Sequence, residues 1–288
     1  LAALWGAPGF SSALPAERLA AGKALAVLGD KRDFDELVEI PAGPFLMGSD
    51  PEKDRHARGE EQPQHEVTLP AYRIGKYPVT VGQFRRFVEE SGYQLATRRC
   101  LEGIANHPVA YVTWHDARAY CAWLTEAWRK AGKISENEEV RLPTEPEWEK
   151  AASASPKLSS SSSLEELQAS KSIYPWGDEW DAAKCNTRES GLGETSPVGM
   201  YPAGASPYGC LDMAGNVWEW TRSIFKEYPY RARDGRESLE GEGSRVLRGG
   251  SWLDLERLAR CASRIRYNPG DFFNLNYGVR VVVSLRRS

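Results

Sequence analysis

The chain has 288 residues and a formal net charge of -3, a length that suits one large domain or two ordinary ones. Hydrophobic residues make up 41% of the sequence and charged residues 27%, which is typical of a globular protein with an ample core. The charge balance argues against a nucleic-acid partner, and no apolar run approaches the roughly 20 residues that a membrane helix needs.

The first 33 residues are interpreted as a helical N-terminal flank. Pro15 to Leu28 form an amphipathic pattern that ends at Gly29. The start of the chain lacks an initiator Met and the basic region of a secretory signal, so we expect a fragment of a longer chain whose upstream module ends in this helix. The main domain is expected over residues 34–288, and "VEIPAGPFLMGSD" and "HEVTLPAYRIGKYPVT" read as its first strands.

Three helices are predicted from capping boxes, in which a Thr side chain caps the first turn and a residue three positions later reaches back. The pairs are Thr80 with Gln83, Thr113 with Asp116, and Thr144 with Glu147. A Ser-rich segment, residues 155–172, follows the third helix and is expected to be an exposed insertion without core side chains. From Tyr174 onward, Gly, Pro, Asn and Trp predict long loops with short strands at Arg245–Leu247 and Val279–Ser284.

Five cysteines are scattered along the sequence, and no two of them form a CxxC pair. This spacing favours neither a zinc site nor a disulfide framework. We therefore expect reduced thiols and a cytoplasmic location, with extracellular or surface display left open. Arg outnumbers Lys, which weakly favours a thermostable protein.

Seven motifs occur in an order that resembles one known family. They are "VEIPAGPFLMGS", "YPVTVGQFRRFV", "HPVAYVTWHDARAYCAWL", "RLPTEPEWEKAA", "YPWGDEW", "GNVWEWT" and "RVLRGGSW…RCASR…NPG…GVRVV". Together they are similar to the formylglycine-generating-enzyme/sulfatase-modifying-factor family over residues 34–285. The resemblance implies an α+β domain with a variant C-type-lectin fold, little regular secondary structure and long loops.

The enzymes of this family oxidise a cysteine of a client sulfatase through a copper-binding cysteine pair after the GGS motif. Here the first of those positions holds Asp254 and the second falls near Ala259, while Cys261 belongs to a separate "RCA" element. One thiolate cannot supply the two soft ligands that copper(I) prefers. We therefore expect no copper and no catalytic residue. Another branch of the family uses iron held by histidines, but the four histidines here have no ligand spacing and are interpreted as surface or capping residues.

The resemblance also implies structural calcium. The family's ligands fall on Asp212, Gly215, Val217 and Glu219, and a second, looser set falls on Asn186, Thr187 and Leu192, with Ser190 or Glu189 as a further donor. Calcium takes six to eight oxygen ligands, often mixing carboxylates and carbonyls. The alternative is that Asn216, Trp218 and Glu219 lock a buried turn by hydrogen bonds alone.

The segment of residues 252–280 is the expected ligand-binding face. It is similar to the variable region of diversity-generating-retroelement variable proteins, in which template adenines are randomised. The candidate variable positions are Leu253, Asp254, Leu255, Ile265, Tyr267, Asp271, Phe272, Phe273, Leu275 and Tyr277. Exposed aromatic side chains are typical binding hot spots, so we expect Phe272, Phe273, Leu275 and Tyr277 to be exposed on one face. The alternative is that they pack beneath the loop.

These observations favour a non-enzymatic recognition protein, monomeric, that binds a protein ligand of unknown identity. Two alternatives stay open: a metal-dependent oxidase of the same family, and a sensor domain of a larger signalling protein. Four arginines near the face, Arg248, Arg264, Arg266 and Arg280, are interpreted mainly as framework salt bridges.

Overall fold

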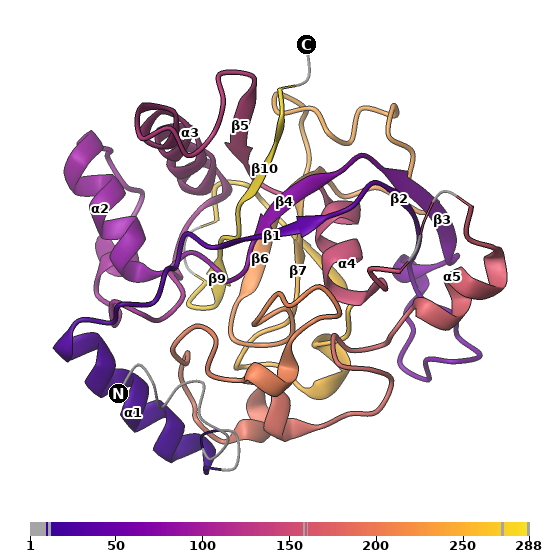
Figure 1. Cartoon of the computed structure of the whole chain (residues 1–288), viewed down its shortest axis with the longest axis horizontal. Helices are drawn as coiled ribbons and strands as arrows, with labels where there is room; N and C mark the ends of the chain where they lie inside the picture. Colours follow the sequence, from indigo (N-terminus) through magenta and orange to yellow (C-terminus); the bar gives the residue numbers. More distant parts are fainter. Residues whose placement is uncertain (1–9, 11–12, 158, 160, 272–273, 287–288) are drawn as a thin grey trace.

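The computed structural model describes residues 10, 13–157, 159, 161–271 and 274–286 (Figure 1). Short helices and strands alternate with long loops, as the sequence predicts for this α+β fold. The helices are α1 Pro15–Leu28, α2 Val81–Ser91, α3 Trp114–Lys130, α4 Glu145–Ser153 and α5 Leu164–Ser170. The strands are β1 Leu37–Ile40, β2 Gly43–Met47, β3 His65–Leu69, β4 Tyr72–Gly75, β5 Glu138–Arg141, β6 Trp218–Ile224, β7 Arg245–Arg248, β8 Arg264–Tyr267, β9 Tyr277–Gly278 and β10 Val282–Leu285.

Two four-stranded sheets bring distant parts of the chain together. In the first, with the order β1-β4-β10-β5, the last strand lies between two strands from the first half, with Val282 opposite both Ile74 and Arg141. In the second, with the order β8-β7-β6-β9, β9 runs parallel to β6 and places Tyr277 opposite Trp218. Strands β2 and β3 form a separate antiparallel pair. The last two strands of the chain, β9 and β10, therefore complete both main sheets.

The three predicted capping boxes are confirmed, each with the Thr side chain accepting a hydrogen bond from the backbone three residues on. Helix α2 ends at Gly92, whose left-handed backbone, φ 66°, suits glycine. Helices α2 and α3 pack together through an aromatic cluster in which Phe84 stacks on Tyr120 with ring centroids 5.5 Å apart. Figure 1 shows these two helices side by side at one end of the first sheet.

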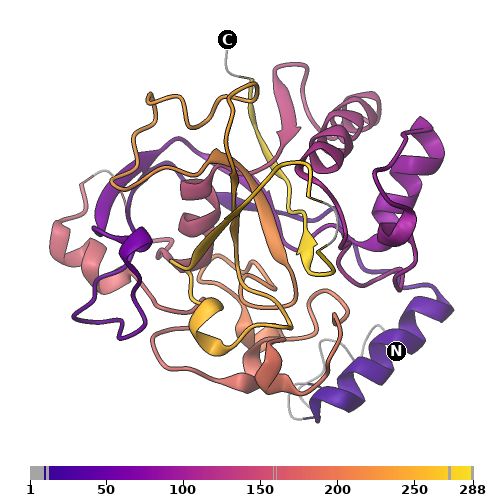
Figure 2. The ribbon, with the colours of Figure 1, turned by 180° about the vertical axis from the view of Figure 1, so that it is seen from behind.

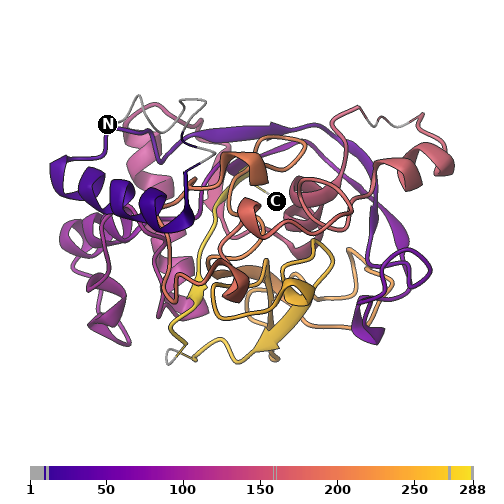
Figure 3. The same cartoon turned by 90° about the horizontal axis from the view of Figure 1, so that it is seen from below.

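Helix α1 packs on the domain along the edge seen in Figure 3. Its Leu19 and Leu25 are buried with Met200 and Tyr201. Arg18 is 2% exposed, donates to the Met200 carbonyl and lies over the Tyr201 ring. Helix α1 therefore shares a small hydrophobic cluster with the loop that contains Met200 and Tyr201.

Two sequence predictions need correction. The Ser-rich segment was expected to supply no core, but it contains α5, whose Leu167 is 1% exposed, and α5 packs against β2. The last strand begins at Val282 rather than Val279, because Val279 and Val281 instead bond with the chain around residues 75–79. In the described part of the chain, no helix combines the length and apolarity that a bilayer crossing needs.

Candidate functional site

The C-terminal segment runs over the side of the molecule opposite β1 and β4, as Figures 2 and 3 show. Among the described residues of 252–280, Tyr267 and Leu275 are the exposed large apolar side chains, at 41% and 38%. Five of the other candidates are partly buried: Leu253, Asp254, Leu255, Ile265 and Asp271. Phe272 and Phe273 lie outside the described residues.

The expectation that Tyr277 is exposed is wrong. Its side chain is 3% exposed and belongs to the main hydrophobic core. The ring meets Trp220 edge-on at 5.6 Å and Tyr267 at 5.0 Å, while the backbone joins β6. The alternative reading, packing beneath the loop, therefore holds for Tyr277.

A cavity of about 620 Å³ lies beside the exposed part of this segment. We call it the Trp252 hollow; its lining includes Arg99, His107, Tyr111, Thr195, Trp252 and Leu275. Trp252 and Leu275 come from the predicted binding segment. The other four come from the loop before α3 and from the loop near residue 195. The guanidinium of Arg99 lies 5.8 Å from the centre of the Tyr111 ring.

Two polar groups of the Trp252 hollow lack a hydrogen-bond partner in the described protein. They are the indole Nε1 of Trp252 and the Nε2 of His107, and both atoms are buried. The other ring nitrogen of His107 lies 3.0 Å from Thr195 Oγ1. Burial, with a smaller contribution from Lys23, lowers the pKa of His107 to about 3, so the ring is neutral at physiological pH. Unpaired buried polar groups are costly, and both side chains line the hollow although the two atoms themselves are closed to solvent.

His107 also corrects the sequence interpretation of the histidines as surface or capping residues, since it is 3% exposed. The sequence indicated the loop before α3 only as a family motif, "HPVAYVTW", and gave no sign that His107 and Tyr111 face the binding segment. The hollow brings together lining residues that are more than a hundred positions apart in the sequence. Local sequence patterns do not report such neighbours.

Asp254 occupies the position of the first expected copper cysteine. Its Oδ2 accepts hydrogen bonds from Trp218 Nε1 at 2.8 Å and from the Ser251 hydroxyl at 2.5 Å. Asn276 in turn donates to Ser251 Oγ at 2.8 Å. The carboxylate is thus held by two donors from the framework, and it links the GGSW turn to β6.

The cysteines do not form a reactive site. All five are free, buried and dispersed through the fold. Burial is the main cause that raises the pKa of Cys100, Cys121 and Cys261, each to about 12. A thiolate is the nucleophile and the metal ligand, so these thiols are poorly suited to either role. Among the residues that the structure describes, no three His, Cys, Asp or Glu side chains gather in a metal-binding group.

The first predicted calcium set does not fit calcium at Glu219. Both carboxylate oxygens of Glu219 accept hydrogen bonds from Arg280 at 2.8 Å, and one also accepts from Trp148 Nε1 at 2.6 Å. Glu219 and Arg280 are both 0% exposed. Burial opposes the charge of Arg280, but the attraction of Glu219 outweighs it and raises the pKa of the guanidinium. Arginine thus supplies the positive charge that a calcium ion would bring.

Asp212 of the first set and the neighbouring Asn216 lie in a turn that side-chain hydrogen bonds hold in place. Asn216 exchanges two side-chain hydrogen bonds with the backbone of Ser196, at 3.0 Å each, and its N–H donates to the Asn186 carbonyl at 2.7 Å. Asp212 accepts from the Gly199 N–H at 2.6 Å. Burial raises the pKa of Asp212 to about 6. These bonds agree with the hydrogen-bonded alternative for Asp212 and Asn216, and calcium at the Gly215 and Val217 carbonyls stays a prediction.

The second predicted calcium set fits in part. Asn186 Oδ1 and the Thr187 carbonyl lie 2.8 and 2.7 Å from one atom, Ser190 Oγ, so the two oxygens face a common point. Glu189 is turned elsewhere and accepts the Glu256 N–H at 3.0 Å. The Leu192 side chain packs toward Met200 and Tyr201. Two converging oxygens fall short of the six to eight that calcium takes, so calcium binding stays a prediction.

The framework role of the arginines is confirmed for three of the four. Arg248 pairs with Glu145 and Glu149, Arg264 pairs with Glu145, and Arg280 with Glu219, all with buried side chains. Arg266 is different, since its guanidinium lies over the Phe225 ring at 4.4 Å.

The model of the sulfatase-modifying factor enzyme 1-like domain matches residues 24–285, and the chain belongs to this family. It is 33% identical to hercynine oxygenase of Mycolicibacterium smegmatis over 253 residues, which are 75% of this chain and 54% of the relative. It is 35% identical to the serine/threonine-protein kinase pkn1 of Chlamydia caviae over 271 residues, 86% of this chain and 38% of the relative. The chain thus spans about half, or less, of these two relatives. The inactive C-alpha-formylglycine-generating enzyme 2 of Bos taurus is 31% identical over 304 residues, with 85% and 86% of the two chains covered.

Solved structures support the fold. PvdO from Pseudomonas aeruginosa superposes with a TM-score of 0.68 at 28% identity, covering 86% of this chain and 94% of its own. Treponema denticola variable protein 1 superposes with a TM-score of 0.58 at 21% identity, covering 85% and 94%. The chain therefore has the formylglycine-generating-enzyme type of C-type-lectin fold that its motifs predict.

Proposed function

We propose that this chain is a non-enzymatic recognition domain, acting as a monomer, that binds a segment of another protein in the Trp252 hollow. The observation that carries the proposal is the hollow itself. It combines the exposed Leu275, the partly buried Tyr111 and Trp252, and two buried polar atoms without partners. Aromatic anchors beside a few unsatisfied polar groups are the features that give a pocket both affinity and orientation.

The position of Asp254 supports a non-enzymatic role. A carboxylate fixed by Trp218 and Ser251 replaces a soft thiolate ligand, and the remaining thiols are buried with raised pKa values. One relative that matches along most of its length is itself named an inactive enzyme.

The finer proposal is that residues 252–280 are the diversified segment of a diversity-generating-retroelement variable protein. Tyr267 and Leu275 fit this role because they are exposed, whereas Tyr277 does not, because it packs in the core. We expect a near-copy of the coding DNA that differs at adenines to lie beside a reverse transcriptase gene. In that near-copy, adenine differences should fall in the codons of Tyr267 and Leu275 and spare that of Tyr277. Sequencing the neighbouring DNA tests this, and differences centred on Tyr277 would contradict it.

Peptide selection on the purified protein tests the recognition role. Peptides selected from a random library against the wild type are expected to lose binding, by tenfold or more, to Trp252→Ala and to Leu275→Asp. Leu239→Asp is the matched control, because Leu239 has the same 38% exposure as Leu275 and lines a different cavity. Loss of binding in all three variants, or in none, would overturn the assignment of the hollow.

A second candidate is an oxygenase or oxidase activity, favoured by the identity to hercynine oxygenase. It is tested by incubating the protein with copper(I) or iron(II), oxygen and a thiol peptide, and following the thiol by mass spectrometry. If turnover is seen and survives Asp254→Ala, the metal must bind at a site that does not include position 254.

A sensor role within a longer chain is a further proposal, supported by the kinase relative, of which this chain spans 38%.

Calcium is proposed for the second set alone, where Asn186 Oδ1 and the Thr187 carbonyl converge. Calorimetric titration of the wild type with calcium tests it, with Asn186→Ala as the variant expected to lose binding. Binding that persists in this variant would contradict the assignment.

A further inference from the structure

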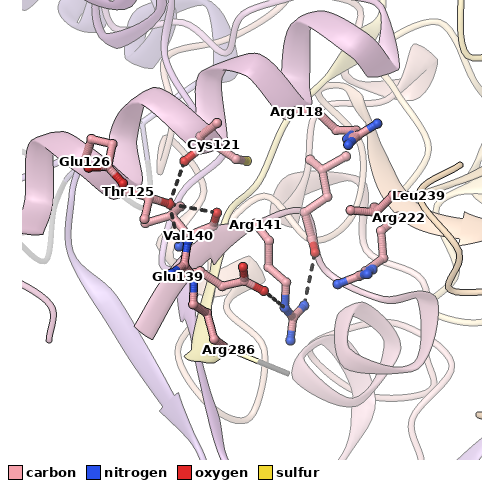
Figure 4. Close-up of a pocket in the computed structure, with 12 residues that line it drawn as sticks. Arg118, Cys121, Thr125, Glu126, Glu139, Val140, Arg141, Arg222, Leu239 and Arg286 are labelled. Atoms are coloured by element: carbon pink, nitrogen blue, oxygen red, sulfur yellow. Dashed lines mark hydrogen bonds and ion pairs between the residues drawn. The ribbon is translucent and has the colours of Figure 1, made fainter. Parts of the chain in front are cut away.

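A second hollow, of about 380 Å³, lies between α3, β5, the 222 position of β6 and the end of β10 (Figure 4). We call it the arginine hollow, because four of its lining residues are Arg118, Arg141, Arg222 and Arg286. Val140, Leu142 and Leu239 add an apolar part to the wall. In Figure 4 the labelled arginines approach the space from different elements rather than from one strand or helix.

The charge of the lining is positive although that of the chain is negative. Four arginines face two carboxylates, Glu126 and Glu139, which leaves a formal balance of +2 against -3 for the whole protein. Glu126 is 62% exposed and pairs with Arg129 at 2.9 Å, outside the arginine set. Glu139 lies 3.9 Å from Arg141. Three further carboxylates, on Glu147, Glu237 and Glu240, lie near these arginines from outside the lining.

Arg141 is the fixed member of the set. It makes a bidentate pair with Glu147, both contacts at 2.7 Å, and donates to Ser284 Oγ at 3.0 Å. Its charge is matched by Glu147, but the remaining donors of the hollow belong to arginines with weaker partners. The guanidinium of Arg118 lies over the Trp114 ring, at 4.8 Å, and 3.7 Å from the carboxylate of Glu240, a side chain that is 89% exposed.

Arg222 and Arg286 have spare donors. The Nη2 of Arg222 donates to the Glu237 carbonyl at 3.1 Å. Its Nε is buried without a hydrogen bond and lies 3.7 Å from Glu237 Oε2, which also has none. Burial, with a smaller contribution from the charge of Arg141, lowers the pKa of Arg222. The guanidinium of Arg286 has no partner among the described residues, and the side chain is exposed.

We propose that the arginine hollow binds a small organic anion, with a carboxylate or phosphate group held by Arg118, Arg222 and Arg286 and an apolar body against Leu239. Guanidinium groups match the oxygens of both anions with paired N–H donors. The volume falls within the roughly 300–1,000 Å³ of small-molecule pockets. The site is separate from the Trp252 hollow, so the proposal does not depend on the recognition role.

Calorimetric titration of the full chain with phenyl phosphate, benzoate and inorganic phosphate tests the proposal. We expect one saturable site that prefers a probe with a ring over inorganic phosphate and that weakens as salt is added. Tighter binding of phenyl phosphate would identify the phosphate source, and tighter binding of benzoate the carboxylate source. Binding of none of the three probes would overturn the proposal.

Variants locate the site. Arg118→Gln and Arg286→Gln are each expected to weaken binding about fivefold or more, since each removes a charge-assisted donor. Arg86→Gln is the matched control for Arg118, because Arg86 also lies over a tryptophan, at 5.4 Å, and pairs loosely with a glutamate, at 4.0 Å. Ala122→Glu adds a negative charge at an exposed helical position of the lining without removing any contact, and it should abolish binding. Equal weakening by Arg86→Gln, or full binding in Ala122→Glu, would refute the site.

Discussion

Asp212 gives the sharpest test of how the locked turn is stabilised. Its side chain is 8% exposed, and burial raises its pKa from 3.8 to about 6. The folded protein therefore holds a proton more tightly than the unfolded chain. Between about pH 4 and pH 6 the folded state binds more protons, so stability falls as pH rises through this window. The difference in pKa corresponds to about 3 kcal/mol at neutral pH, to order of magnitude.

The substitution Asp212→Asn removes the ionisation and keeps an acceptor for the Gly199 N–H, which lies 2.6 Å from the carboxylate. The backbone of Asp212 is left-handed, φ 57°, a conformation that Asn tolerates well. We expect the free energy of unfolding of the variant to exceed that of the wild type by about 1–3 kcal/mol at pH 8, and by about half that at pH 5. Asp178→Asn, at an exposed position, is the control and should change stability by less than about 0.5 kcal/mol at either pH.

Urea unfolding followed by tryptophan fluorescence, in EGTA, measures both free energies. A variant that is less stable than the wild type at pH 8 would refute the reasoning, because it would mean that the charged carboxylate contributes favourably. The same experiment with calcium addresses the sequence prediction for this residue. If Asp212 ligated calcium, adding the ion would stabilise the wild type more than the variant; we expect no such difference.

Three other predictions follow from the packing and from the proposed ion. Tyr277→Ala should lower the free energy of unfolding, measured with urea, by about 3 kcal/mol, whereas Leu275→Ala should lower it by less than about 1 kcal/mol. Equal losses in the two variants would contradict the burial of Tyr277. Arg280→Met should cost about 3–5 kcal/mol by leaving Glu219 buried and unpaired, and the double variant with Glu219→Gln should recover part of that loss. Calcium should raise the melting temperature of the wild type but not of Asn186→Ala, and scanning calorimetry with EGTA as the reference would show it; an equal rise in both would argue against the second calcium set.

The sequence predicted α2, α3 and α4 well because each was encoded locally, whereas α5 was missed. Thr80, Thr113 and Thr144 each lie three residues before their capping partner, so the hydrogen bonds that start the helix are fixed within one turn. The family motifs predicted the fold for another reason, since seven of them in order restrict the chain to one arrangement. The Ser-rich segment was misjudged at Leu167 because composition reports the average polarity of a segment and not the one side chain that turns inward.

The candidate site was harder to predict because its contacts are long-range. Turn-forming residues around Tyr277 indicated a surface loop, but the parallel pairing of β9 with β6 brings this ring against Trp220, more than fifty residues earlier. Two residues away, Leu275 has no such strand partner and stays 38% exposed. No local pattern separates these two positions. For the same reason the sequence did not predict that His107 lines the same hollow as Trp252, since folding alone brings the two together.

Buried ion pairs, rather than cysteines, hold the segment of residues 252–280 in place. Buried arginines anchor it on both sides: Arg248 reaches two glutamates of α4, and Arg280 reaches Glu219 of β6. Charged groups at 0% exposure can be removed only together, since either partner alone would be left buried and unpaired. The chain between these anchors is held in the same way, by Arg260 on Asp54 and Glu61 and by Arg264 on Glu145. Asp254 adds to these constraints by accepting hydrogen bonds from Trp218 and Ser251, so the position after the GGSW turn is fixed by the protein framework itself.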